Sequence, residues 1–89
     1  MQKETFIDAL NEIIFNEHKS LALNSQAYAR IADPKFSLKA PDSKMSKKEE
    51  LALRQSRLTE LSKSMKELVS SIKTMEEVLK DAKAGKFNF

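Results

Sequence analysis

Apolar residues recur every three or four positions through two long segments of this 89-residue chain, with a polar, proline-containing stretch between them. This spacing is typical of amphipathic α-helices, because residues three and four apart share one helix face. Thr5 followed by Asp8 fits a capping box, so the first helix is predicted to begin at Phe6, and Pro34 predicts its end near Asp33. Its main apolar stripe consists of Phe6, Ile7, Leu10, Ile13, Ile14, Leu21, Tyr28 and Ile31.

The second segment carries the stronger pattern, a heptad repeat in which Leu51 occupies position a. The successive a and d positions are Leu51, Arg54, Leu58, Leu61, Met65, Leu68, Ile72, Met75, Leu79 and Ala82. Arg54 is the one basic interruption of this stripe. Five heptads of this kind are typical of a coiled-coil seam, so this segment predicts a long helix that packs along another helix.

Turn and capping residues set the ends of the second helix and the bend before it. Ser46 and Glu49 fit a capping box, and Gly85 is well placed to end the helix. Pro34 and Pro41 break the helical periodicity between the two segments. The predicted order is therefore a helix over 6–31, a bend over 33–45, a helix over 47–84 and a short tail over 85–89.

Two helices joined by one bend predict an all-α fold, an antiparallel two-helix hairpin in a single domain over residues 1–89. At 1.5 Å per residue the helices measure about 39 Å and 57 Å, so about 18 Å of the longer one lacks a partner from its own chain. A lone hairpin has one helix–helix interface and buries little apolar surface against its ordering entropy. We therefore expect a homodimer that forms a four-helix bundle, with a higher homo-oligomer or completion by a different protein as the alternatives.

Two groups of apolar residues are predicted to form the oligomer or partner interface. A second apolar face on the first helix contains Phe15, Ala22 and Leu23, together with Ala29. A helix that is apolar on two sides is generally buried on two sides. On the second helix the predicted interface residues are Leu58, Leu61, Met65, Leu68, Ile72, Met75 and Leu79.

The composition excludes several classes of function. The chain has one glycine and no cysteine, which rules out a disulfide scaffold, a thiolate metal site and a glycine-rich phosphate loop. No nucleophile, base and acid stand at catalytic spacing, so we predict a protein that is not an enzyme and needs no cofactor or metal. Neither a membrane-spanning stretch nor a secretory signal is recognisable, and a cytoplasmic protein is the expectation.

A polar notch interrupts the first helix at Glu17, His18, Asn24 and Ser25. One interpretation is a polar layer that fixes helix register, as a buried asparagine does in coiled coils, or simply an exposed edge. The other is a pH-sensitive or ligand-contacting group centred on His18, the chain's one histidine. The metal-binding spacings His-x-x-x-His and Glu-x-x-His are missing from the sequence.

The bend is basic, and it is the best candidate for a function beyond packing. Lysines at the start of a helix favour phosphate binding through charge and free backbone amides together. Against this, the net charge is only +3 and the chain has three arginines, so a solvated loop is the plainer interpretation. The candidate phosphate-binding residues are Lys35, Lys39, Lys44, Lys47 and Lys48.

These patterns favour a non-enzymatic, homo-oligomeric helical protein that binds another macromolecule, as an adaptor, chaperone or inhibitor. The alternative is a helical binder of nucleic acid or of a nucleotide phosphate that uses the basic bend, Lys35–Lys48. The tail Phe87-Asn88-Phe89 leaves three possibilities open: it docks on a partner, it folds back on the helices, or it frays.

Overall fold

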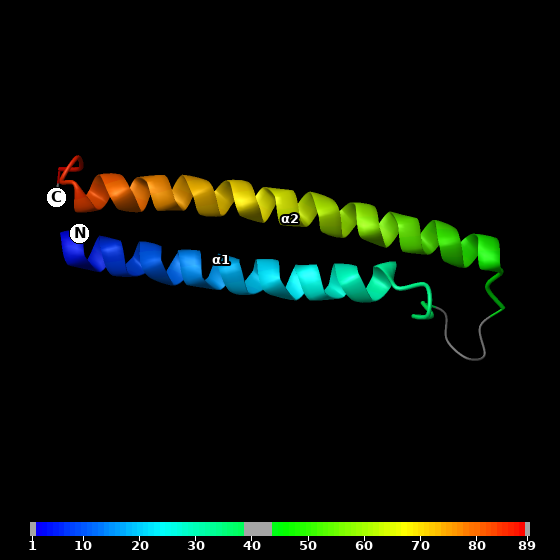
Figure 1. The fold of residues 1–89 in the computed structure, drawn as a ribbon. Coiled ribbons are helices and arrows are strands. Elements are labelled where there is room, and N and C mark those ends of the chain that lie inside the picture. The colour runs from blue at the N-terminus through cyan, green and yellow to red at the C-terminus, as the bar shows by residue number, and fades with distance from the viewer. Residues whose placement is uncertain (1, 39–43, 89) are drawn as a thin grey trace.

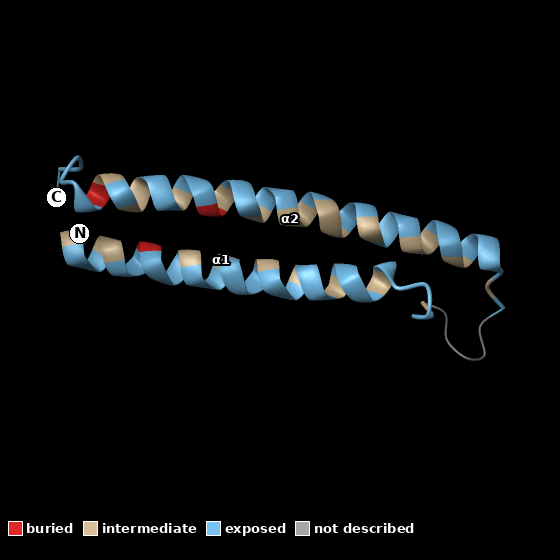
Figure 2. Cartoon of the chain, viewed as in Figure 1, coloured by how far each residue is buried: buried red, intermediate tan, exposed pale blue. Residues whose placement is uncertain are grey.

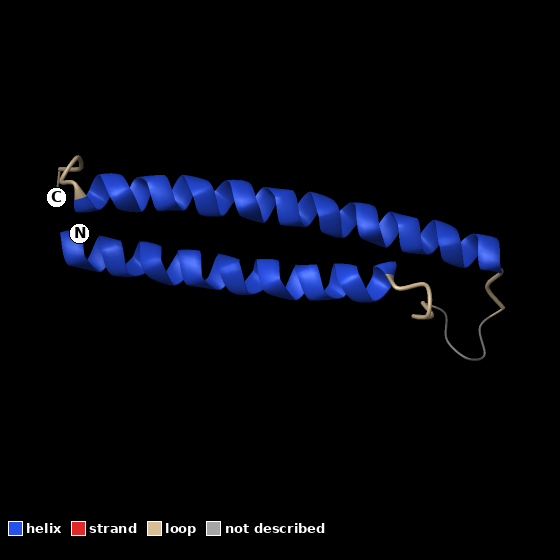
Figure 3. Cartoon of the chain, in the orientation of Figure 1, coloured by secondary structure: helices blue, strands red, loops and turns tan. Residues whose placement is uncertain are grey.

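The chain folds as an antiparallel hairpin of two long helices, as the computed structural model shows (Figure 1). The structure describes residues 2–38 and 44–88, and within them α1 spans Lys3–Ala32 and α2 spans Lys47–Lys83. Figure 3 shows that loops are confined to the two ends of the hairpin. The molecule measures 60 × 18 × 17 Å. The prediction of an all-α antiparallel hairpin is therefore confirmed.

The start of α1 differs from the prediction. The helix begins at Lys3, with Gln2 at the N-cap position, and no side chain caps it. The amide of Phe6 already donates to the carbonyl of Gln2 at 3.0 Å, so Thr5 lies inside the first turn. The predicted Thr5 capping box is wrong. Packing stabilises the first turn instead: the Phe6 and Phe87 rings lie edge-to-face, with their centroids 5.8 Å apart.

Both ends of α2 follow from the residues that predicted them. The Ser46 hydroxyl accepts the Glu49 amide at 3.1 Å, which confirms this capping box. Gly85 has φ +76°, the left-handed conformation that glycine adopts without steric cost. The Gly85 amide donates to the Ala82 carbonyl, and the Lys86 amide donates to the Asp81 carbonyl. This pair of bonds is a Schellman motif, and it ends α2 one residue before the predicted boundary.

The core is a narrow strip between the two helices (Figure 2). Among the described residues, only Leu10, Ile72 and Ala82 are buried. Leu51, predicted as the first seam residue, is 66% exposed because it lies beyond the last turn of the shorter α1. In α1, Ile13 is also largely exposed, at the edge of the strip. The other leucines and methionines of the predicted seam are half-buried: Leu58, Leu61, Met65, Leu68, Met75 and Leu79.

The short segment after α2 packs against the start of α1. At the end where the chain begins and finishes, Phe87 folds back onto Phe6. A 3.3 Å ion pair between Lys86 and Asp81 supports this arrangement. Of the three possibilities left open for the tail, the structure shows the fold-back for Phe87, while Phe89 lies outside the described residues.

Candidate interaction surfaces

Two polar pairs interrupt the apolar strip between α1 and α2. The Asn24 side-chain amide donates to the Ser64 hydroxyl at 3.1 Å, and the Ser71 hydroxyl donates to Glu17 Oε1 at 2.8 Å. Glu17 Oε2 is buried and has no hydrogen-bond partner among the described residues. Both pairs join the two helices of the chain, so they fix one register of α1 against α2. A slip by one residue would break both bonds.

The other two residues of the predicted notch lie outside this strip. His18 Nε2 is 3.6 Å from Glu76 Oε1, and both side chains are 56% exposed. The Ser25 hydroxyl is exposed and donates to the Leu21 carbonyl of its own helix. The predicted polar notch is therefore divided between an interior pair, Glu17 and Asn24, and an exposed pair.

The sequence does contain a signal that separates these two pairs. Leu10, Glu17, Asn24 and Ile31 recur every seven residues, so Glu17 and Asn24 share a helix position with two apolar residues. Their neighbours in sequence, His18 and Ser25, are rotated by about 100° toward solvent. A heptad assignment of α1 alone would have placed each member correctly.

Arg54 of α2 binds the C-terminal end of α1 at the bend end of the hairpin. Its guanidinium donates to the carbonyls of Ile31, Asp33 and Phe36. These acceptors include a carbonyl of the last turn of α1, where helical carbonyls lack an intrahelical donor. The positive charge also suits the negative end of the α1 dipole. The basic interruption of the seam is thus a C-terminal cap supplied from the other helix.

Glu50 of α2 likewise binds the segment that follows α1. Its Oε1 accepts the Leu38 amide at 3.2 Å and lies 3.7 Å from the Arg54 guanidinium. The Arg54 and Glu50 side chains are only 14% and 16% exposed. Neither role was predicted from the sequence, because the backbone carbonyls that accept from Arg54 and the backbone amide that donates to Glu50 leave no residue signature in the chain.

The surface retains large apolar side chains that no described residue covers. Phe15 is 68% exposed, Leu23 is 56% exposed and Val69 is 54% exposed. Ala22 is exposed as well. The second apolar face predicted on α1 therefore lies open. The interface residues predicted on α2, from Leu58 to Leu79, are by contrast half-buried or buried between α1 and α2 of the same chain.

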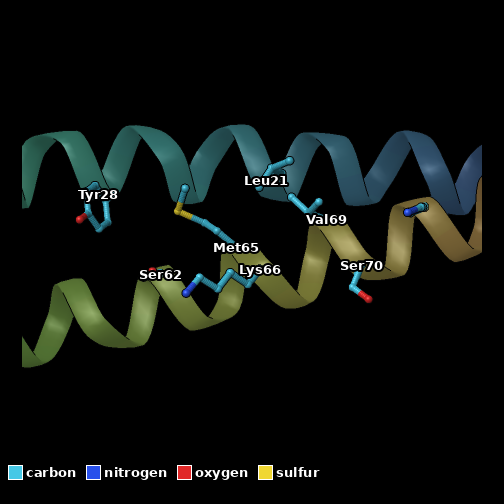
Figure 4. A pocket seen from close by; sticks show the side chains of 8 residues that line it. Leu21, Tyr28, Ser62, Met65, Lys66, Val69 and Ser70 are labelled. Carbon is cyan, nitrogen blue, oxygen red and sulfur yellow. The ribbon is translucent and has the colours of Figure 1, made fainter.

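One side of the hairpin contains an open apolar groove, which we call the Tyr28 groove (Figure 4). It has a volume of about 580 Å³ and is formed by Leu21 and Tyr28 of α1 with Met65 and Val69 of α2. In Figure 4 the Leu21, Met65 and Val69 side chains lie between the two helices. The groove continues toward Gln55 as a second hollow of about 520 Å³.

The charged residues of the Tyr28 groove come from α2. Lys66 and Lys73 line its main part, where the described lining residues include no carboxylate. Lys63 and Glu67 line the continuation. The groove is therefore an apolar trough with an excess of positive charge on its α2 rim.

A smaller groove of about 320 Å³ lies beside the bend. Leu23, Ala27 and Ile31 of α1 form it together with Phe36 and Leu38 from the segment that follows α1. Leu23 is about 160° around the helix from Leu21, which lines the Tyr28 groove, so this groove lies on the other side of α1. The hairpin consequently exposes apolar surface on both sides.

The predicted phosphate-binding lysines are placed as follows. Lys35, Lys44, Lys47 and Lys48 are exposed, whereas Lys39 lies outside the described residues. At the start of α2 the Glu49 amide is already bonded to the Ser46 hydroxyl. Glu49 and Glu50 add two carboxylates to the same first turn, which offsets the charge of the lysines beside them.

The described residues contain no group of three or more histidine, aspartate or glutamate side chains that could hold a metal ion. Within the same residues, neither helix has an apolar stretch of the length needed to cross a membrane. Comparison with family models, curated proteins and solved structures finds no match to this chain.

Proposed function

We propose that this chain is a non-enzymatic helical protein that self-associates, as a homodimer closing into a four-helix bundle, and acts by binding another macromolecule. Adaptor, chaperone and inhibitor are the roles that fit such a surface. The observation that carries this proposal is the imbalance between burial and exposure. Three residues are buried in the described part of the chain, while eight large apolar residues remain exposed there.

The imbalance matters because burial of apolar surface is the main favourable term in folding. Each ordered residue loses about 1–2 kcal/mol of backbone entropy, and a single strip of half-buried side chains offsets this poorly. Contiguous exposed apolar surface is also a mark of a protein–protein interface. A second layer of helices supplies the missing burial and covers the exposed side chains at once.

Analytical ultracentrifugation combined with circular dichroism at several protein concentrations tests self-association. We expect a dimer whose helicity and melting temperature rise with concentration, because mass action links association to folding. A fully helical monomer with a concentration-independent melting temperature would contradict the proposal.

Two substitutions distinguish the contribution of the exposed apolar surface to dimerisation from the packing of α1 against α2 within one hairpin. Leu61→Asp places a charge on a half-buried residue between α1 and α2, so we expect loss of helicity and assembly together. Phe15→Asp changes a residue that is 68% exposed, so we expect helical content at high concentration to persist while the dimer weakens. Equal loss of helicity in both variants would show that Phe15 belongs to the hairpin core.

Affinity capture from the source cell addresses the binding partner. A partner retained by wild-type protein and lost with Leu23→Asp, at unchanged circular dichroism, supports docking through the exposed apolar surface. Binding of nucleic acid that weakens steeply with salt, and disappears when Lys44, Lys47 and Lys48 are replaced by glutamine, would instead support the basic-bend alternative.

A further inference from the structure

The Tyr28 groove is flanked by two outward rows of residues with complementary character. On α1 the row repeats every seven residues as Asp8, Phe15, Ala22 and Ala29. Asp8, Phe15 and Ala22 stand three positions before Asn11, His18 and Ser25, and so lie about 60° around α1 from them, next to the side on which His18 lies 3.6 Å from Glu76. The row thus consists of an acid, an aromatic ring and two small side chains.

On α2 the corresponding row is basic. Lys66, Lys73 and Lys80 recur every seven residues along one side of the helix, with Lys66 and Lys73 lining the groove itself. Val69 stands between them at the groove wall and is 54% exposed. Within one hairpin both rows are exposed to solvent, so the residues of one row do not pack against those of the other.

We propose that the Tyr28 groove is covered by the Tyr28 groove of a second copy of this chain, with α1 of each copy lying along α2 of the other. This inference rests on the proposed self-association and names the surface that carries it. The four helices then form a bundle in which every neighbouring pair of helices is antiparallel.

The charges select this arrangement from the two that a two-fold axis allows. With the axis along the helices, α1 meets α2 of the partner, and the row of Asp8, Phe15, Ala22 and Ala29, which carries one carboxylate and no cation, meets the basic row. With the axis across the helices, α2 meets α2, and Lys66, Lys73 and Lys80 face their own copies. Like charges in such contacts are destabilising, so the first arrangement is favoured.

The register inside the hairpin indicates which residues meet between the copies. Asn24 pairs with Ser64, and Glu17 pairs with Ser71. The same register between copies brings Phe15 within one helical turn of the partner's Val69 and the partner's Lys73. It also brings Asp8 near the partner's Lys80. An exposed ring then meets an exposed apolar side chain and a cation, two contacts that favour association.

The size of the face is sufficient for a specific dimer. The 30 residues of α1 extend over about 45 Å, and the hairpin is 18 Å wide. The face therefore offers roughly 800 Å² per copy, which is the area of a standard protein–protein interface. The smaller groove beside Leu23 and Phe36 lies on the other side and stays outside this interface.

Thiol cross-linking tests the arrangement, because the natural chain has no cysteine and each introduced thiol is the only one. Ala22→Cys and Val69→Cys are made as separate full-length proteins, one with a mass tag, and are mixed at equilibrium. A thiol–thiol linker spanning about one helical turn tolerates small errors in register better than a disulfide does. The matched control replaces Val69→Cys with Glu60→Cys, an exposed residue on the opposite side of α2.

We expect the mixture of Ala22→Cys and Val69→Cys to yield the tagged–untagged dimer at least about tenfold faster than the Glu60→Cys control. Cross-linking of Val69→Cys with itself at the same rate as in the mixture would overturn the inference, because it would place α2 on α2. Sedimentation distinguishes the two levels of the argument. A dimer whose thiols fail to link refutes this interface and leaves self-association standing, whereas a helical monomer refutes both.

Discussion

Arg54 offers the sharpest test of how the hairpin is held together. Its guanidinium donates to carbonyls of Ile31, Asp33 and Phe36, and its side chain is only 14% exposed. Arg54→Met removes all three bonds and the 3.7 Å ion pair with Glu50, and it keeps only an unbranched apolar side chain that is shorter than that of arginine. Methionine at this heptad position also completes the apolar seam. The substitution therefore sets hydrogen bonding and charge directly against apolar packing.

The magnitude follows from the exposure of the acceptors. A hydrogen bond to a charged group contributes about 1.5–3 kcal/mol, but water can replace it where the acceptor is exposed. The bonds to Asp33 and Phe36 are exposed, whereas the bond to Ile31 is partly buried. We therefore expect a loss of about 1–3 kcal/mol in the free energy of unfolding, dominated by the Ile31 carbonyl. For a chain of this size that corresponds to roughly 5–20 °C in melting temperature.

The assay is urea denaturation followed by circular dichroism at one fixed protein concentration, with Arg57→Met as the control. Arg57 lies three residues along α2 and is exposed, so its replacement removes the same charge without removing a cap. Hydrogen exchange adds a local readout, because the Phe36 amide donates to the Asp33 carbonyl and should exchange faster in Arg54→Met. A denaturation midpoint equal to or above that of wild type would show that a continuous apolar seam is worth more than the cap, and would refute this reasoning.

Three further predictions concern the helix ends and the polar layer. Ser46→Ala removes the acceptor of the Glu49 amide and should lower stability by about 1 kcal/mol, seen as a lower urea midpoint. Gly85→Ala should lower the melting temperature by a few degrees, because the backbone at residue 85 has φ +76°, which alanine adopts only with strain. An added Cβ would meet no described atom within 4 Å, so an unchanged melting temperature would show that this backbone conformation costs alanine nothing. Glu17→Met replaces a carboxylate whose Oε2 is buried and has no hydrogen-bond partner in the described part of the chain, so the urea midpoint should rise by the equivalent of about 1 kcal/mol. A fall in that midpoint would show that the bond from Ser71 outweighs the desolvation.

The features that the sequence predicted well are those in which local chemistry and periodicity agree. In α2, Ser46 and Gly85 stand at the two ends of the heptad pattern, and the helix boundaries fall within one residue of the prediction. In α1 the capping box predicted at Thr5 did not form, and the helix begins earlier, at Lys3, where packing of Phe6 against Phe87 stabilises the first turn. That contact joins residues at opposite ends of the chain, and no short window contains it.

The interaction surfaces were harder to predict than the helices. The exposed face with Phe15 and Leu23 was expected from α1 alone, because it depends only on the rotation of one helix. The Tyr28 groove depends on the rotation of both helices and on their register. That register is set by Asn24 with Ser64 and by Glu17 with Ser71, pairings of ordinary polar residues that carry no sequence signature.

The polar contacts between α1 and α2 and the small core have the same cause, because polar residues occupy some of the heptad positions between the helices. Glu17, Asn24 and Arg54 occupy heptad positions that apolar residues would otherwise fill, and each makes a contact that only one alignment of the hairpin allows. Such groups add little net stability after desolvation, but they penalise every other alignment. The hairpin is thus specific in geometry and poor in burial, while Phe15 and, in the Tyr28 groove, Val69 remain exposed. Under the proposed self-association, the partner copy supplies further burial, so a change on that face that weakens the dimer should also lower the melting temperature at low protein concentration.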